Sequence, residues 1–133
     1  MAKRTHTVKA KTHQLSGIEL TGAGKRFNRE WIFKGFSYQF QPGTHYAITG
    51  PNGSGKSTLL QAIAGSLQLS EGSLEWKNEG IIDPEQVFLH LAIVAPYLEL
   101  IEEMSAREFL HFHAQFKPLI AGISIDEILQ IIG

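Results

Sequence analysis

The alternation of apolar and polar residues predicts several strands, most of them in the first 80 residues. One candidate strand is short and ends in the turn-rich stretch 21–24, and another is rich in aromatic residues. Pro42 and Gly43 form a strong turn signal between two of the candidates. The predicted strands cover residues 17–21, 31–40, 44–49, 72–77 and 89–94.

Apolar residues at helical spacing follow a glycine-rich stretch near residue 55 and predict a helix there. The glycine at position 65 is a plausible stop for this helix. The periodic positions are Leu59, Leu60, Ile63, Ala64 and Leu67.

Two capping boxes predict two more helices in the last third of the chain. In each box a serine hydroxyl and a glutamate carboxylate satisfy each other's free backbone N–H groups. Ser105 with Glu108 predicts a helix that ends before Pro118, and Ser124 with Glu127 predicts a short final helix. Strands interleaved with helices indicate an α/β architecture.

Composition narrows the class of protein further. The 133 residues are 43% hydrophobic and 19% charged, which is ordinary for a globular domain. The formal charge of −1 offers no electrostatic attraction for nucleic acid, so we expect no nucleic-acid partner. There are no cysteines, which excludes disulfides and thiolate metal sites. No apolar run approaches the roughly 20 residues that span a bilayer, so we expect no direct membrane insertion.

The first 14 residues are basic and lack an apolar segment, so they do not match a secretory signal. We interpret residues 1–14 as a flexible N-terminal tail and residues 15–133 as the folded domain.

Residues 50–57, G-P-N-G-S-G-K-S, match the phosphate-binding pattern G-x-x-x-x-G-K-[ST] in full. Gly53 and Gly55 allow successive N–H groups to converge on one anion, and the following helix adds its positive end. Lys56 is predicted to reach the β- and γ-phosphates and is our catalytic candidate, and the Ser57 hydroxyl is predicted to bind Mg²⁺. The pattern therefore predicts a site for a purine nucleoside triphosphate with magnesium. Its predicted binding residues are Gly50, Pro51, Asn52, Gly53, Ser54, Gly55, Lys56, Ser57 and Thr58.

This segment and its surroundings resemble the ATP-binding subunits of ABC transporters from about Leu15 onward. The matching stretches are GPNGSGKSTLL at 50–60, Ala64-Gly65, Ser70-Glu71-Gly72, Lys25-Arg26-Phe27, Phe36-Ser37, Pro42-Gly43, Glu102-Glu103-Met104-Ser105 and Glu108. The resemblance implies an α/β P-loop NTPase with an ABC-type core and an N-terminal antiparallel strand region.

The resemblance also implies a function. It indicates an ABC-type ATPase that binds ATP and Mg²⁺ to energise transport across a membrane. Its implied partners are a second copy of the subunit and a transmembrane permease, at the cytoplasmic face of the membrane. In the family an aromatic residue after the first strand stacks on adenine, and Phe27 matches that position; the alternative is that Phe27 is a core residue. Trp31 and Tyr38 are expected to pack.

Two departures from the family pattern bear on activity. The signature, Walker B and switch-histidine segments do not appear before Gly133, so we interpret the sequence as truncated before the helical subdomain and expect the 133 residues alone to be inactive. Aligning the acidic stretch at 102–105 also places Pro96 where the family has its Q-loop glutamine. Proline has no side-chain oxygen for Mg²⁺ or for the attacking water.

Other functions fit the sequence less well or stay open. A nucleotide-binding module with weak or no hydrolysis is one alternative, and a soluble ABC protein without a membrane partner is another. No Asn-Lys-x-Asp guanine motif supports a small GTPase. The histidines at 90, 111 and 113 do not predict a metal site, because positions two apart on a helix point in different directions.

Overall fold

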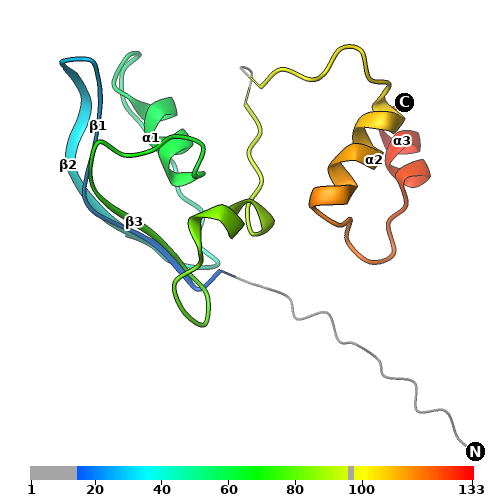
Figure 1. Ribbon diagram of the computed structural model, residues 1–133, viewed down its shortest axis with the longest axis horizontal. Coiled ribbons are helices and arrows are strands. Elements are labelled where there is room, and N and C mark those ends of the chain that lie inside the picture. Colours follow the sequence, from blue (N-terminus) through cyan, green and yellow to red (C-terminus); the bar gives the residue numbers. More distant parts are fainter. Residues whose placement is uncertain (1–14, 96–97) are drawn as a thin grey trace, which may run out of the picture. The chain divides into compact units, whose positions relative to one another are not determined.

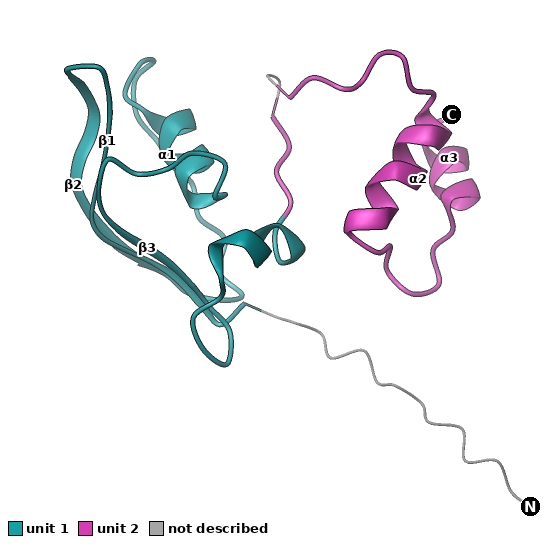
Figure 2. Cartoon of the chain, in the orientation of Figure 1, with its two compact units in different colours: residues 1–91 teal, residues 92–133 magenta. Residues whose placement is uncertain are grey.

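The computed structural model describes residues 15–95 and 98–133. Two compact units make up the chain, residues 1–91 and residues 92–133 (Figure 2). The first unit holds the sheet, the glycine-rich loop and its helix, and the second holds a pair of helices (Figure 1).

A three-stranded antiparallel sheet, in the order β2-β1-β3, forms the base of the first unit (Figure 1). The central strand β1 (Gly17–Phe27) pairs along its length with β2 (Glu30–Phe40), and on its other side with β3 (Glu71–Lys77). The predicted strands at 31–40 and 72–77 are therefore confirmed, as is an antiparallel region at the N-terminal side.

The predicted end of the first strand at residue 21 is wrong, because β1 continues to Phe27 through the glycine-rich stretch. The pairing of β1 shifts register around this stretch, as at a β-bulge. Gly22 (φ 56) and Gly72 (φ 76) lie face to face there, and a Cβ on Gly72 would stand 2.4 Å from the Gly22 backbone. These glycines thus permit a close approach of two strands. In the sequence, such glycines cannot be distinguished from the glycines of a turn.

Helix α1 (Lys56–Ile63) packs against the sheet through its apolar side. Leu59 joins Leu20 and Ala23 of β1 in a buried cluster. Trp76 of β3 is also buried, and its indole Nε1 donates a hydrogen bond of 2.9 Å to the Ile63 carbonyl. That bond satisfies one of the carbonyls that a helix leaves free at its C-terminal end. Gly65, at φ 74, follows the helix end as predicted.

Two predicted strands are absent from the described residues. Residues 44–49 lead into the glycine-rich loop without forming a helix or a strand, and residues 90–94 are likewise irregular. The chain before them, Pro84–Leu89, forms a 3₁₀ helix (η1) that begins at the Asp83 cap. A strand is stabilised by hydrogen bonds to neighbouring strands, and neither segment pairs with a strand of the described sheet. The apolar composition of these two segments was therefore not enough to predict strands.

The second unit contains α2 (Ala106–Phe116) and α3 (Ile125–Ile132). Both predicted capping boxes are present, with the serine hydroxyl accepting from the glutamate N–H and the glutamate carboxylate accepting from the serine N–H. Arg107 of α2 also forms an ion pair of 2.6 Å with Asp126 of α3. The helix boundaries here follow from local signals in the sequence.

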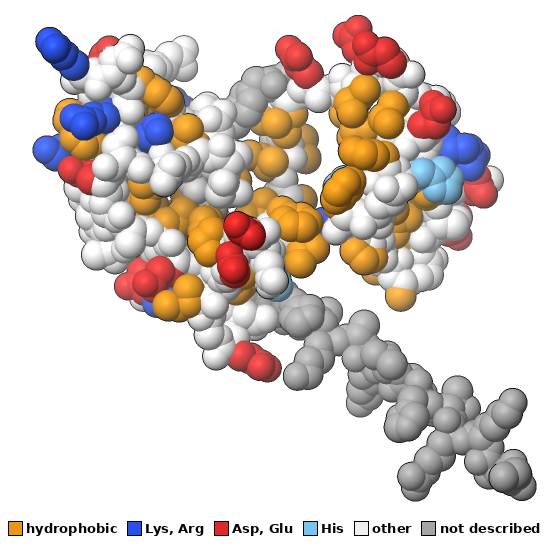
Figure 3. All heavy atoms as spheres, in the orientation of Figure 1, with side chains coloured by type: hydrophobic (Ala, Val, Ile, Leu, Met, Phe, Trp, Pro, Cys, Tyr) orange, Lys and Arg blue, Asp and Glu red, His pale blue; other side chains and the backbone are white. Residues whose placement is uncertain are grey.

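Apolar side chains remain exposed on both units (Figure 3). On the first unit they include part of an aromatic group on β2 and the segment after it, where Tyr38 and Tyr46 are 46% and 40% exposed. Tyr38 lies 4.8 Å from Phe40 and 5.9 Å from Tyr46 between ring centroids. The expected packing of Tyr38 is thus confirmed, although it packs at the surface.

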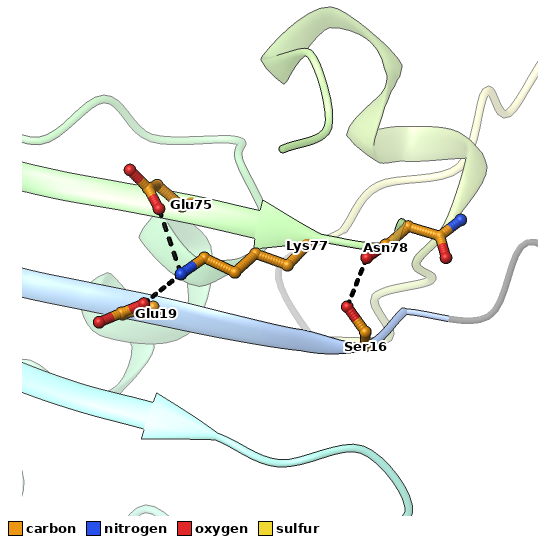
Figure 4. Close-up of polar contacts among 5 residues, drawn as sticks. All are labelled: Ser16, Glu19, Glu75, Lys77 and Asn78. Atoms are coloured by element: carbon orange, nitrogen blue, oxygen red, sulfur yellow. Dashed lines mark hydrogen bonds and ion pairs between the residues drawn. The ribbon is translucent and has the colours of Figure 1, made fainter. Parts of the chain in front are cut away.

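A charged cluster joins β1 and β3 on the surface of the sheet (Figure 4). The Lys77 ammonium contacts the carboxylates of Glu19 and Glu75, the latter at 3.4 Å. The hydrogen bond to Glu19 is the main cause of a raised pKa at Lys77. Ser16 extends the contact by donating to the Asn78 carbonyl at 2.8 Å.

Candidate functional site: the phosphate-binding loop

The loop between residues 50 and 55 is shaped by glycines in backbone conformations that other residues rarely adopt. Gly53 has φ 80 and Gly55 has φ 86, both in the left-handed region. Gly55 is also the N-cap of α1. A Cβ on Gly55 would stand 2.7 Å from Cγ2 of Ile32 on β2, so a side chain at this position would collide with the sheet.

The Lys56 side chain folds back over the loop that precedes it. Its Nζ donates hydrogen bonds to the carbonyl oxygens of Gly50 at 2.8 Å and Pro51 at 2.7 Å. The Ser54 N–H bonds to the Pro51 carbonyl at 3.2 Å and closes the turn. An ammonium group is thereby held beside the backbone of the loop, with one of its three donors left for another partner.

The N-terminus of α1 opens onto the same place. The first helical bond runs from the Leu59 N–H to the Gly55 carbonyl at 2.8 Å, so the preceding N–H groups have no partner within the helix. Gly55 supplies no side-chain cap, and the first turn contains no acidic residue. The positive end of the helix is therefore available to an external anion.

These groups line an open depression of about 470 Å³. Its lining consists of Ile32, Asn52, Gly53, Gly55, Lys56, Ser57 and Thr58. Within the described part of the chain, no carboxylate lines this depression. An ammonium, two hydroxyls and a helix N-terminus suit a highly charged anion such as a polyphosphate.

The depression brings together six of the residues predicted from the sequence, namely Asn52, Gly53, Gly55, Lys56, Ser57 and Thr58. Gly50, Pro51 and Ser54 do not line the depression, but they hold Lys56 and close the loop. Ile32 was missed, because nothing distinguishes one apolar strand residue from its neighbours in sequence. Only the folded chain places it against the loop.

Phe27 lies at the end of β1 and does not line the depression. Its side chain is 48% exposed and belongs to neither described apolar cluster, so the alternative of a core residue is wrong. The Lys25 ammonium stands 5.1 Å from the centroid of its ring. Trp31 packs as expected and is flanked by Arg26 and Lys34 at 5.6 and 4.7 Å from its ring centroid.

Two further expectations concern metal binding and the Q-loop. Among the described residues, no group of three or more acidic or histidine side chains could hold a metal ion. Pro96 lies outside the described residues, as does the predicted tail at residues 1–14. The equivalence of Pro96 with the family glutamine therefore stays a prediction.

A family model for ABC transporters matches residues 33–132, which include the loop, its helix and the second unit. The chain belongs to the ABC transporter family. It therefore has the ABC type of P-loop NTPase fold that the glycine-rich loop suggested, with the observed antiparallel sheet as its N-terminal strand region.

Individual ABC relatives match over much of this chain. The cytochrome c biogenesis ATP-binding export protein CcmA of Agrobacterium fabrum is 34% identical over 116 residues, covering 83% of this chain and 53% of the relative. CcmA of Bartonella henselae is 36% identical over 123 residues, covering 88% of this chain and 58% of the relative. The aliphatic sulfonates import ATP-binding protein SsuB 1 of Paraburkholderia xenovorans is 38% identical over 73 residues, covering 53% of this chain and 22% of the relative. This chain thus spans about half the length of the CcmA relatives.

No helix in the described part of this ABC chain is both long enough and apolar enough to cross a membrane.

Proposed function

We propose that the chain binds Mg-ATP through residues 50–58 and that the protein acts as the ATP-binding subunit of an ABC transporter. The observation that carries the proposal is the uncapped N-terminus of α1, with the Lys56 ammonium held beside the same depression. The relatives named above are described as ATP-binding proteins of export or import systems, which supports transport as the process.

The residues of the depression fit a triphosphate with magnesium. Backbone N–H groups of the loop and of α1 suit phosphate oxygens, and Lys56 adds a positive charge that can leave its carbonyl partners for the β- and γ-phosphates. Ser57 lies at the start of α1 and would supply a hydroxyl ligand to Mg²⁺. When bound, the ion neutralises charge that develops on the transferred phosphoryl group.

Phe27 is proposed to hold the purine. An exposed aromatic ring offers a face to a planar base, and such stacking contributes roughly 1–3 kcal/mol in nucleic-acid complexes. The half-exposed ring of Phe27 suits this role better than it suits packing. The contact tolerates any purine, so selection of ATP over GTP would require other groups.

In the complete protein, ATP binding and hydrolysis are proposed to drive transport together with a second copy of the subunit and a transmembrane permease. The permease would hold the subunit at the cytoplasmic face of the membrane. The family assignment and the names of the relatives support these partners.

A second candidate function is nucleotide binding with weak or no hydrolysis. It is favoured by Pro96, which the family resemblance places where the Q-loop glutamine stands, because proline has no side-chain oxygen to orient the attacking water. An ABC protein without a membrane partner would show the same site.

The test of nucleotide binding is the substitution Lys56→Ala, with affinity for Mg-ATP measured by calorimetry. Hydrogen bonds from a charged donor contribute roughly 1.5–3 kcal/mol each, so the affinity should fall at least about tenfold. Lys34→Ala is the matched control, because it also removes an ammonium, but one that lies over Trp31 and does not line the depression. Equal affinities for wild type and Lys56→Ala would contradict the proposed site.

A further inference from the structure

Lys25 is a half-buried cation with two fixed contacts beside the ring of Phe27. Its Nζ donates a hydrogen bond of 2.7 Å to the Gln68 carbonyl and stands 5.1 Å from the Phe27 ring centroid. Lys25 lies on β1, and a displacement of its ammonium would break one of these two contacts. The proposed purine-stacking ring is therefore adjacent to a group of fixed position.

The same end of β1 is bonded to the chain that follows α1. The Arg26 N–H donates to the Ser70 hydroxyl at 3.1 Å, and the Ser70 N–H donates to the Gly24 carbonyl at 2.8 Å. Residues 68–70 thus connect the strand that bears Phe27 with the helix whose N-terminus faces the phosphate site. On the other side of the hairpin, Ile32 contacts Gly55 of the loop.

We propose that Lys25 is a positioning residue for Phe27, which holds the ring in the orientation that stacks on a purine. This inference rests on the proposed role of Phe27. The half-exposed Phe27 ring lacks the close packing that selects one rotamer in a protein core. The adjacent Lys25 ammonium restrains the rotamer instead. The ring then presents its free face to the base without losing rotational freedom on binding.

Lys25 does not act on the phosphates directly in this proposal. It is absent from the lining of the phosphate depression, and its ammonium donates to the Gln68 carbonyl. Its contribution should consequently depend on the presence of a base in the ligand and on the presence of the Phe27 ring.

The experiment compares two ligands in the complete protein by calorimetry. One is a non-hydrolysable ATP analogue with Mg²⁺, and the other is inorganic triphosphate with Mg²⁺. Lys25→Ala should weaken the ATP analogue about two- to fivefold, the equivalent of a cation–π contact at an exposed site, and should leave triphosphate affinity unchanged. In a Phe27→Ala background, Lys25→Ala should have no further effect on either ligand.

Three variants separate positioning from a general structural role. Lys25→Arg keeps the cation and should restore affinity for the analogue. Lys25→Gln keeps a neutral hydrogen-bond donor for the Gln68 carbonyl but removes the positive charge. It should bind the analogue as weakly as Lys25→Ala does, and it tests the role of the charge should Lys25→Ala fold poorly. Lys34→Ala removes the cation over Trp31 and should change neither affinity.

The outcomes distinguish this inference from the proposed function. If Phe27→Ala weakens the analogue but Lys25→Ala does not, positioning by Lys25 is overturned and stacking survives. If Lys25→Ala weakens the binding of triphosphate equally, or has the same effect on affinity in the Phe27→Ala background, Lys25 acts through its charge or through the fold, and positioning is overturned. If Phe27→Ala leaves the analogue unaffected, both stacking and positioning by Lys25 are overturned, while phosphate binding by residues 50–58 is judged separately with Lys56→Ala.

Discussion

At the scale of single residues, the glycines of the loop differ in why they are needed. Gly53 and Gly55 both have positive φ, but a Cβ on Gly53 would meet nothing within 4 Å, whereas a Cβ on Gly55 would meet Ile32. A non-glycine residue in this backbone region costs about 1–3 kcal/mol in strain alone. The position of Gly55 adds a steric demand that its backbone angle does not reveal.

We therefore expect Gly55→Ala to lower the free energy of unfolding more than Gly53→Ala. Both variants carry the strain of positive φ, but only Gly55→Ala also collides with β2. Urea denaturation of the two variants measures the difference. Equal losses of stability would mean that the sheet moves away at no cost and that Ile32 does not constrain the loop.

At the scale of elements, the helices of the second unit depend on charged capping boxes. Bonds from Ser105, chiefly from its hydroxyl, lower the pKa of the Glu108 carboxyl below its usual 4.5. Bonds from Ser124, chiefly from its backbone N–H, lower the pKa of Glu127 in the same way. A carboxyl whose pKa is lower in the folded state stabilises that state above its unfolded pKa, and the benefit is lost as the pH falls through the folded value.

The expected result is that α2 and α3 lose stability as the pH drops below 4.5. Glutamine also serves in a capping box but does not titrate, so the double variant Glu108→Gln, Glu127→Gln should show a smaller loss over the same range. Helical circular dichroism during urea titrations at several pH values measures this. Glu99→Gln, outside both boxes, is the control, and a double variant with the wild-type pH dependence would refute the assignment.

At the scale of the whole molecule, exposed apolar surface favours self-association. Strand β2 is an edge of the described sheet, the segment at 44–49 that follows it is unpaired, and the aromatic group they share is partly exposed. Unpaired edges with apolar side chains are sites where a second chain can add.

We expect the 133-residue chain to form dimers or larger species as its concentration rises, seen by light scattering. Tyr38→Lys places a charge on the exposed edge and should shift the chain toward the monomer. Ile81→Lys alters an isoleucine that is 69% exposed away from this surface, so it should have little effect. A wild-type chain that stays monomeric at every concentration would contradict the prediction.

The sequence by itself determined the features that depend on near neighbours in the chain. The glycine-rich loop with Lys56, the stop at Gly65 and both capping boxes are local patterns, because their hydrogen bonds and backbone angles involve residues only a few positions apart. The aromatic strand at 31–40 could also be predicted, because the alternation of its apolar and polar residues is a local pattern. Membership of the ABC family followed from the same local motifs.

Only the tertiary structure decided the features that depend on distant residues. It turned the glycines after residue 21 into a bulge against Gly72, left residues 44–49 without a strand partner, and placed Ile32 against Gly55. It also set Lys25 between Phe27 and Gln68. Such contacts join residues far apart in the chain, and whether a segment pairs or a side chain is restrained depends on what the fold brings beside it.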